Sequence, residues 1–144
     1  MTEELSFFGK LDAATVEKAG EVLDGPHSGL IKRVRAVYSA EKDKHSTIWT
    51  FQVIDDTDES HMRRMDEWLQ YYPNMTEEDR NSLDTKSRSI MDRNIKRLRN
   101  RLEQLKVDLN GDVPSEVSYI EDVAVDFTIY TSGTGFRSVT FRVK

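Results

Sequence analysis

Two segments of the chain have the residue types that a divalent metal ion would need. Asp55–His61 places carboxylate and hydroxyl oxygens beside one imidazole, and such groups are common metal ligands. No second cluster with matching spacing accompanies it, so a solvated polar turn is the favoured interpretation. Asp108–Asp112 is similar to the start of a calcium loop, but its glycine falls at position four instead of six, and Tyr119 stands where the bidentate glutamate belongs. The sequence therefore predicts neither a metal site nor a cofactor.

The glycine-rich segment and the histidines form no catalytic pattern either. Thr131–Gly135 lacks the lysine of a phosphate-binding loop and leads into strand-like sequence, whereas such a loop leads into a helix. It therefore predicts a hairpin turn. His27, His45 and His61 are scattered and have no evident serine, cysteine or aspartate partner. We expect a protein without enzymatic activity, and a small hydrolase with an unrecognised site is the catalytic alternative.

Aromatic residues interleaved with cations are the strongest indication of binding chemistry. Single-stranded nucleic acid uses this combination, because bases stack on flat side chains for about 1 to 3 kcal/mol each while cations follow the phosphates. A buried core is the alternative, and it is favoured for the aromatic residues of the regularly alternating apolar segments: Trp49, Phe51, Phe127 and Phe141. The candidate nucleic-acid-binding residues are Lys32, Arg33, Arg35, Tyr38, Trp68, Tyr71, Tyr72, Tyr130 and Arg137.

These side chains need a β-sheet to position them. Thr47–Ile54 alternates apolar and polar residues at period two, which is typical of a strand with one buried face. Trp68–Tyr72 is interpreted as a short third strand, with the end of a small helix as the alternative. The other expected strands are Gly29–Tyr38, which forms a hairpin with Thr47–Ile54, and the pair Val123–Tyr130 and Val139–Val143.

One long helix is expected over about residues 76–109. Thr76 can cap its first turn, and Gly111 with Pro114 ends it. Its apolar residues recur at helical spacing on one face, which we expect to pack on the domain's own sheet, with a coiled-coil dimer seam as the alternative. This stripe is Met91, Ile95, Leu98, Leu102, Leu105 and Leu109.

The same helix is the most basic part of an acidic chain. From Lys86 to Lys106 eight cations face two acids, whereas the whole chain has a net charge of −5. The cations spread around most of the helix and form no single face that could follow phosphates. We therefore expect the helix to act mainly as a cover for the sheet.

The composition indicates one globular domain. The 144 residues are enough to bury one core, and the absence of cysteine excludes disulfides and thiolate zinc sites. The acidic start lacks a signal-peptide pattern, and no apolar stretch is long enough to cross a bilayer, so we expect a cytoplasmic protein without membrane contact. Residues 1–27 are expected to form an acidic N-terminal arm with a short helix at Ala13–Leu23, and residues 28–144 to form a single domain that includes the long helix.

The order of these elements resembles that of an oligonucleotide-binding (OB) fold, a small, partly open Greek-key barrel of five strands. Residues 29–38, residues 48–53, the leucine-rich helix and residues 120–127 together look like phage-encoded single-stranded-DNA-binding proteins. The resemblance implies a mainly β fold with one long helix (α+β), in which the helix lies between strands three and four as the lid of an OB-like barrel. It also implies that DNA runs along the face of strands one to three.

The expected function is therefore non-enzymatic binding of single-stranded DNA, with little sequence preference, in phage replication or recombination in the host cytoplasm. Single-stranded RNA is a second ligand that the same chemistry would accept. The alternative is a protein-interaction module that uses the long helix or the N-terminal arm. A homodimer through the helix or a strand edge is also compatible with the sequence.

Overall fold

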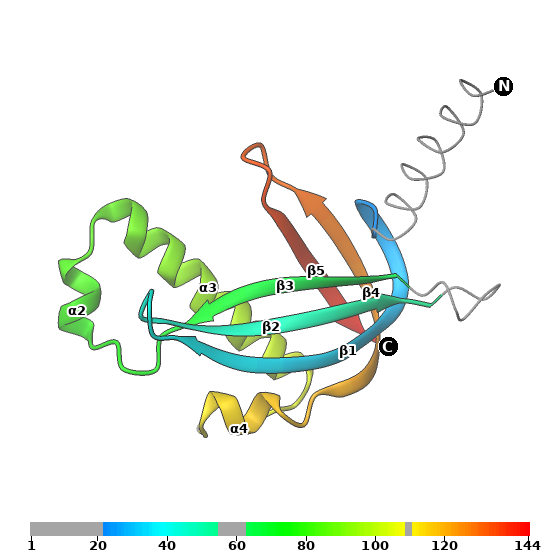
Figure 1. Cartoon of the computed structure of the whole chain (residues 1–144), viewed down its shortest axis with the longest axis horizontal. Coiled ribbons are helices and arrows are strands. Elements are labelled where there is room, and N and C mark those ends of the chain that lie inside the picture. Colours follow the sequence, from blue (N-terminus) through cyan, green and yellow to red (C-terminus); the bar gives the residue numbers. More distant parts are fainter. Residues whose placement is uncertain (1–21, 55–62, 109–110) are drawn as a thin grey trace, which may run out of the picture.

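The computed structural model describes residues 22–54, 63–108 and 111–144 (Figure 1). All five expected strands are present in these ranges, and the segment around Trp68 is a strand, not the end of a helix. In chain order the elements are β1 (Gly25–Ser39), β2 (Lys44–Val53), β3 (Arg64–Tyr71), α2 (Glu77–Ser82), α3 (Thr85–Gln104), α4 (Val113–Val117), β4 (Glu121–Thr131) and β5 (Arg137–Val143).

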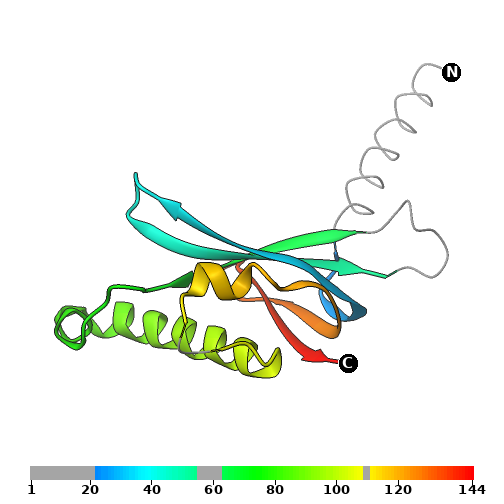
Figure 2. The same ribbon diagram turned by 90° about the horizontal axis from the view of Figure 1, so that it is seen from below.

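The strands form one antiparallel sheet in the order β3-β2-β1-β4-β5. β1 is the longest strand and pairs with both β2 and β4. The sheet curls into a half-barrel, so that β5 turns back toward β3 and the two edge strands come into contact (Figures 1 and 2). The prediction of a mainly β domain is confirmed. The β4–β5 turn lies at Thr131–Gly135 as predicted, with Gly135 at φ +87°.

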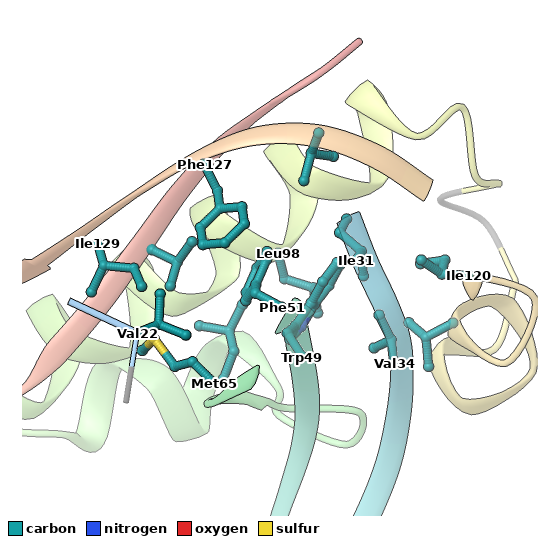
Figure 3. Packing of buried hydrophobic residues seen from close by; sticks show 14 of the residues in the cluster. Val22, Ile31, Val34, Trp49, Phe51, Met65, Leu98, Ile120, Phe127 and Ile129 are labelled. Carbon is teal, nitrogen blue, oxygen red and sulfur yellow. The ribbon is translucent and has the colours of Figure 1, made fainter. Parts of the chain in front are cut away.

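The core lies on the concave side of the curled sheet. Figure 3 shows Trp49 and Phe51 of β2, Phe127 of β4 and Leu98 of α3 pointing into it. Trp49, Phe51 and Phe127 are buried and Phe141 is partly buried, which confirms their predicted role as core residues. Both α3 and α4 lie on this side of the β1–β3 part of the sheet, and no described element covers the opposite side (Figure 2).

Two features of β1 set which side chains face the core. A Cβ at Gly29 would lie 2.0 Å from the backbone oxygen of Gln52, so this position can hold only glycine if β1 and β2 are to pair this closely. The register shifts between Ile31 and Arg33, as in a β-bulge. Because of the shift, both Ile31 and Val34 face the core although they are three residues apart.

The prediction of one helix over residues 76–109 was wrong, because Leu83 and Asp84 interrupt it. Thr76 caps α2 as expected, with a capping box to Asp79. Asp84 then starts α3 anew, since its carboxylate accepts a hydrogen bond of 2.6 Å from the backbone N–H of Ser87. α3 ends at Gln104.

The apolar stripe of α3 packs on the domain's own sheet, as predicted. Met91, Leu98 and Leu102 are buried, and Leu98 and Leu102 belong to the same core as the strands. Ile95 and Leu105 are half-buried. Leu109 lies outside the described residues.

Several other predictions also fall outside the described residues. These are the Asp55–His61 cluster, most of the expected helix Ala13–Leu23, and residues 1–21 of the expected N-terminal arm. β1 begins at Gly25, three residues before the predicted start of the domain, and Val22 is already part of the core. Within the described ranges, no helix is long and apolar enough to cross a membrane, and no group of three or more histidine, cysteine, aspartate or glutamate side chains could hold a metal ion.

Candidate nucleic-acid interface

The side of β1–β3 that faces away from the core, here called the outer face, carries an exposed tryptophan beside cations. Arg35 pairs with Ile48, and Ile48 pairs with Trp68, so the three form one row across three strands. Trp68 is 64% exposed, whereas Ile48 between it and Arg35 is buried. Neighbouring strands lie about 4.8 Å apart, so the backbones of Arg35 and Trp68 are about 10 Å apart.

The next row of the outer face holds a second free cation. Arg33 pairs with Thr50, and Thr50 pairs with Asp66. Asp66 is occupied, since it accepts a hydrogen bond of 2.6 Å from the Thr50 hydroxyl. Neither Arg33 nor Arg35 forms an ion pair with any side chain of the described part of the chain, and both are exposed. Their charges are therefore available to an anionic ligand.

Lys32 differs from these two arginines. It lies at the bulge, is half-buried, and forms an ion pair of 2.9 Å with Asp122 at the start of β4. Its charge is thus largely neutralised within the protein.

Tyr119 is an exposed aromatic residue near this cationic strand that sequence reasoning missed. It is 87% exposed and lies two residues before Glu121, which pairs with Arg33. The short helix α4 directs the chain to this position, with Asp112 capping its start and Val117 buried in the core. Because no pattern predicted α4, no sequence signal placed Tyr119 beside β1.

Tyr38 and Tyr71 lie on the core-facing side of the sheet, at the end that holds the β1–β2 turn. The ring of His45 lies between them, with centroid distances of 4.5 Å to Tyr38 and 5.4 Å to Tyr71. A hydrogen bond from the Tyr38 hydroxyl to Asp43 raises the pKa of that phenol. Burial raises the pKa of Tyr71, with a smaller contribution from the charge of Asp112. These two tyrosines are therefore not part of the row that contains Trp68.

The remaining predicted residues lie at two other places. Tyr72 follows β3 directly and is half-buried, with its hydroxyl 3.4 Å from the Asn94 amide nitrogen. Tyr130 and Arg137 lie at the β4–β5 hairpin, beside the start of β1. That end is about 30 Å along β1 from Arg35. Arg137 is also occupied, since it bonds to Asp24 at 3.3 Å and to the backbone oxygen of Val22.

A buried ion pair under Trp68 fixes the direction in which β3 presents its side chains. Glu67, the residue before Trp68, points to the core and lies 2.5 Å from Arg101 of α3. Both side chains are only 5% exposed. The guanidinium of Arg101 also lies over the Trp49 ring at 4.8 Å. Burial lowers the pKa of Arg101, and the charge of Glu67 opposes this shift.

The same pair joins the two edges of the half-barrel. One Glu67 oxygen accepts a hydrogen bond of 2.7 Å from the backbone N–H of Val139 in β5. The Val139 carbonyl in turn accepts from Arg101 at 2.8 Å and from Arg97 at 3.0 Å. Side chains from β3 and α3 therefore satisfy backbone groups of β5 at the place where the two edge strands meet.

This arrangement divides the basic residues of α3 between two roles. Arg97 and Arg101 turn toward the sheet and serve the junction with β5. The cations of α3 that remain exposed are Lys86, Arg93, Lys96 and Arg99, and Lys106 just after the helix is exposed as well. The helix itself lies on the side of the sheet opposite to the outer face (Figure 2).

The arrangement that emerges is a sheet face with the exposed indole of Trp68 and, on β1, the exposed guanidinium groups of Arg33 and Arg35, which form no ion pair with a described residue. A scan against protein-family models found no match, and a search of curated proteins also found none.

Proposed function

We propose that the protein binds single-stranded nucleic acid across the outer face of β1–β3, without catalysing a reaction. The observation that carries the proposal is Trp68, a large aromatic side chain that is 64% exposed on a sheet face. A base that stacks on it would gain about 1 to 3 kcal/mol. Arg33 and Arg35, two strands away, would neutralise phosphates on either side of that base.

The architecture supports an OB-like barrel as the frame of this site. Such a barrel has five strands, is partly open, and has a ligand face that centres on strands two and three. Here five strands form one curled sheet, β3 and β5 come into contact, and α3 comes between β3 and β4 in the chain. Trp68 lies on β3, within the face that this layout would use.

The same chemistry favours binding with little sequence preference. Stacking on an indole accepts any base, and an arginine on a phosphate carries no sequence information. DNA is the preferred ligand in the proposal, in keeping with the resemblance to phage-encoded single-stranded-DNA-binding proteins and with a role in replication or recombination. RNA would compete for the same surface.

The test is a titration with a short thymidine oligomer at two salt concentrations, with R33Q/R35Q beside the wild-type protein. Each lost phosphate contact should reduce the slope of log affinity against log salt by about 0.7, so the double variant should lose about 1.4. K96Q/R99Q on α3 is the matched control, since it removes the same charge from exposed positions on another side. The proposal fails if the wild-type protein shows no salt-sensitive binding at micromolar concentration.

A protein-interaction role for α3 is the second candidate, because its exposed cations have only Glu103 as an unpaired acidic neighbour within the helix. Such a surface would suit an acidic partner. The control variant separates the two functions. If K96Q/R99Q loses oligomer binding while R33Q/R35Q does not, the anionic ligand binds α3 and the outer face is not the site.

A further inference from the structure

A cavity of about 360 Å³ lies at the end of β3, enclosed by the β1–β2 turn, the segment after β3, and α2. Its volume is near the lower limit of small-molecule sites, which run from about 300 to 1,000 Å³. α2 contributes Asp79 and Ser82 to its lining, together with the cap residue Leu83. The side chains that define its chemistry are Lys44, His45, Gln70, Tyr71, Tyr72 and Asn74.

The cavity lies at the end of the sheet and borders both of its sides: Gln70 on its lining has the orientation of the outer face, whereas His45 and Tyr71 lie on the core-facing side. Gln70 pairs with Ser46 and is two residues from Trp68, so it has the same orientation relative to the sheet. Two strand residues span about 6.6 Å. A strand of nucleic acid that passes over Trp68 toward the β1–β2 turn would therefore reach this cavity within one or two steps.

The cavity presents flat rings, amide groups and one free cation. Tyr71 contributes a buried ring whose centroid lies 5.4 Å from that of His45, with the two rings inclined by 58°. Amides such as those of Gln70 and Asn74 can bond to the edges of an unstacked base. Lys44 at the opening forms no ion pair with another residue in the described ranges.

Two acidic side chains line the cavity, and hydrogen bonds from neutral groups hold both in fixed positions while leaving their negative charges in place. Asp43 accepts a hydrogen bond of 2.7 Å from the Tyr38 hydroxyl. Asp79 belongs to the capping box of α2, with its carboxylate 3.3 Å from the backbone nitrogen of Thr76. Lys44 is the one cation among the residues that line the cavity, so a phosphate would bind on its side, away from the two carboxylates.

We infer that this cavity holds one unstacked nucleobase of the bound strand, with Lys44 on the phosphate beside it. The inference rests on the proposed function and extends it, because it gives the strand a fixed position instead of free sliding over Trp68. Its test is a set of thymidine oligomers, each with a single 2-aminopurine at a different position, whose fluorescence reports how that base is stacked.

The expected result is one position whose fluorescence differs strongly from the others in the wild-type complex. Asn74→Met places a longer apolar side chain beside the cavity from an exposed loop position, without a ring on which a base could stack, and it should reduce that difference and weaken binding roughly tenfold. Trp68→Ala is the control: it should weaken binding but keep the position-specific signal. If N74M does not fold, Lys44→Gln at an exposed site should weaken the same signal and should reduce the salt slope by about 0.7.

The outcomes separate the two proposals. If the oligomers bind with salt dependence but no labelled position responds to N74M or K44Q, the cavity is not a base site and the proposed function stands. If no oligomer binds at all, both are overturned.

Discussion

Replacing Arg101 with methionine should be among the most destabilising single substitutions on α3. The change removes the partner of Glu67, a carboxylate that is only 5% exposed and 2.5 Å from the guanidinium. Arg97 remains, but at 3.4 Å and with a side chain that is 24% exposed. Breaking a buried pair by removing one partner costs about 3 to 5 kcal/mol. Since the free energy of unfolding of a domain of this size is about 5 to 15 kcal/mol, R101M would remove a large part of that stability.

The double variant E67M/R101M should be more stable than R101M alone. No buried charge is then left uncompensated, and two methionines can fill the space beside the aromatic core. The remaining cost is the backbone N–H of Val139, which loses the Glu67 oxygen at 2.7 Å. An unsatisfied buried donor costs about 1 to 3 kcal/mol, so the double variant should be less stable than the wild-type protein by an amount within that range.

Urea unfolding followed by tryptophan fluorescence is the assay. The chain has two tryptophans, and a Trp68→Phe background leaves the buried Trp49 as the single reporter. R99M is the matched control, because Arg99 is exposed on the same helix and should change stability by less than about 0.5 kcal/mol. The reasoning is refuted if R101M costs less than about 1 kcal/mol, or if the double variant is less stable than R101M.

Three further predictions concern the frame of the site. Gly29→Ala should lower the free energy of unfolding by about 3 kcal/mol or more, because the added Cβ would overlap β2. Gly133→Ala should change the free energy of unfolding little, because a Cβ there meets open space. Equal losses of stability in urea unfolding of the two variants would contradict this. Hydrogen bonds that Asp84 accepts from Ser87 lower the pKa of the Asp84 carboxyl below 3.8. The ionised cap should therefore contribute its full stabilisation above pH 3.8 and lose it as the pH falls through the lowered pKa. Asp84→Asn should keep the cap and remove this part of the pH dependence of the melting temperature. Asp43→Asn should lower the pKa of Tyr38 in an NMR titration, since the hydrogen bond to Asp43 is its main cause, and an unchanged pKa would show that the bond does not form in solution.

The strands and the helical stripe could be predicted because each follows one simple period. Trp49 and Phe51 alternate with polar residues, and Leu98 and Leu102 are one helical turn apart. Both periods report burial on one side of an element, which is what the sheet and α3 provide. The split between α2 and α3 had a signal that the prediction overlooked, namely Asp84 as an N-cap residue.

The site itself depended on facts that a single sequence does not contain. The bulge at Lys32 decides that Arg33 and Arg35 share a face with Trp68, and no local pattern reveals a register shift. Tyr38 and Tyr71 were grouped with Trp68 because they are close to it or to cations in the sequence, but strand alternation places them on the other side. Glu67 could have been found, since it occupies an apolar position between Met65 and Leu69, yet its partner Arg101 looked like a surface charge.

The most direct test of the central claim uses the two indole N–H signals of the protein. Trp68 is 64% exposed on the outer face, and Trp49 is fully buried in the core with its indole nitrogen bonded to Thr47 at 2.8 Å. In an NMR titration with a thymidine oligomer, the Trp68 signal should shift progressively and saturably, and the Trp49 signal should stay in place. Binding that leaves the Trp68 signal unmoved, or the absence of any change at micromolar protein and low salt, would contradict the account.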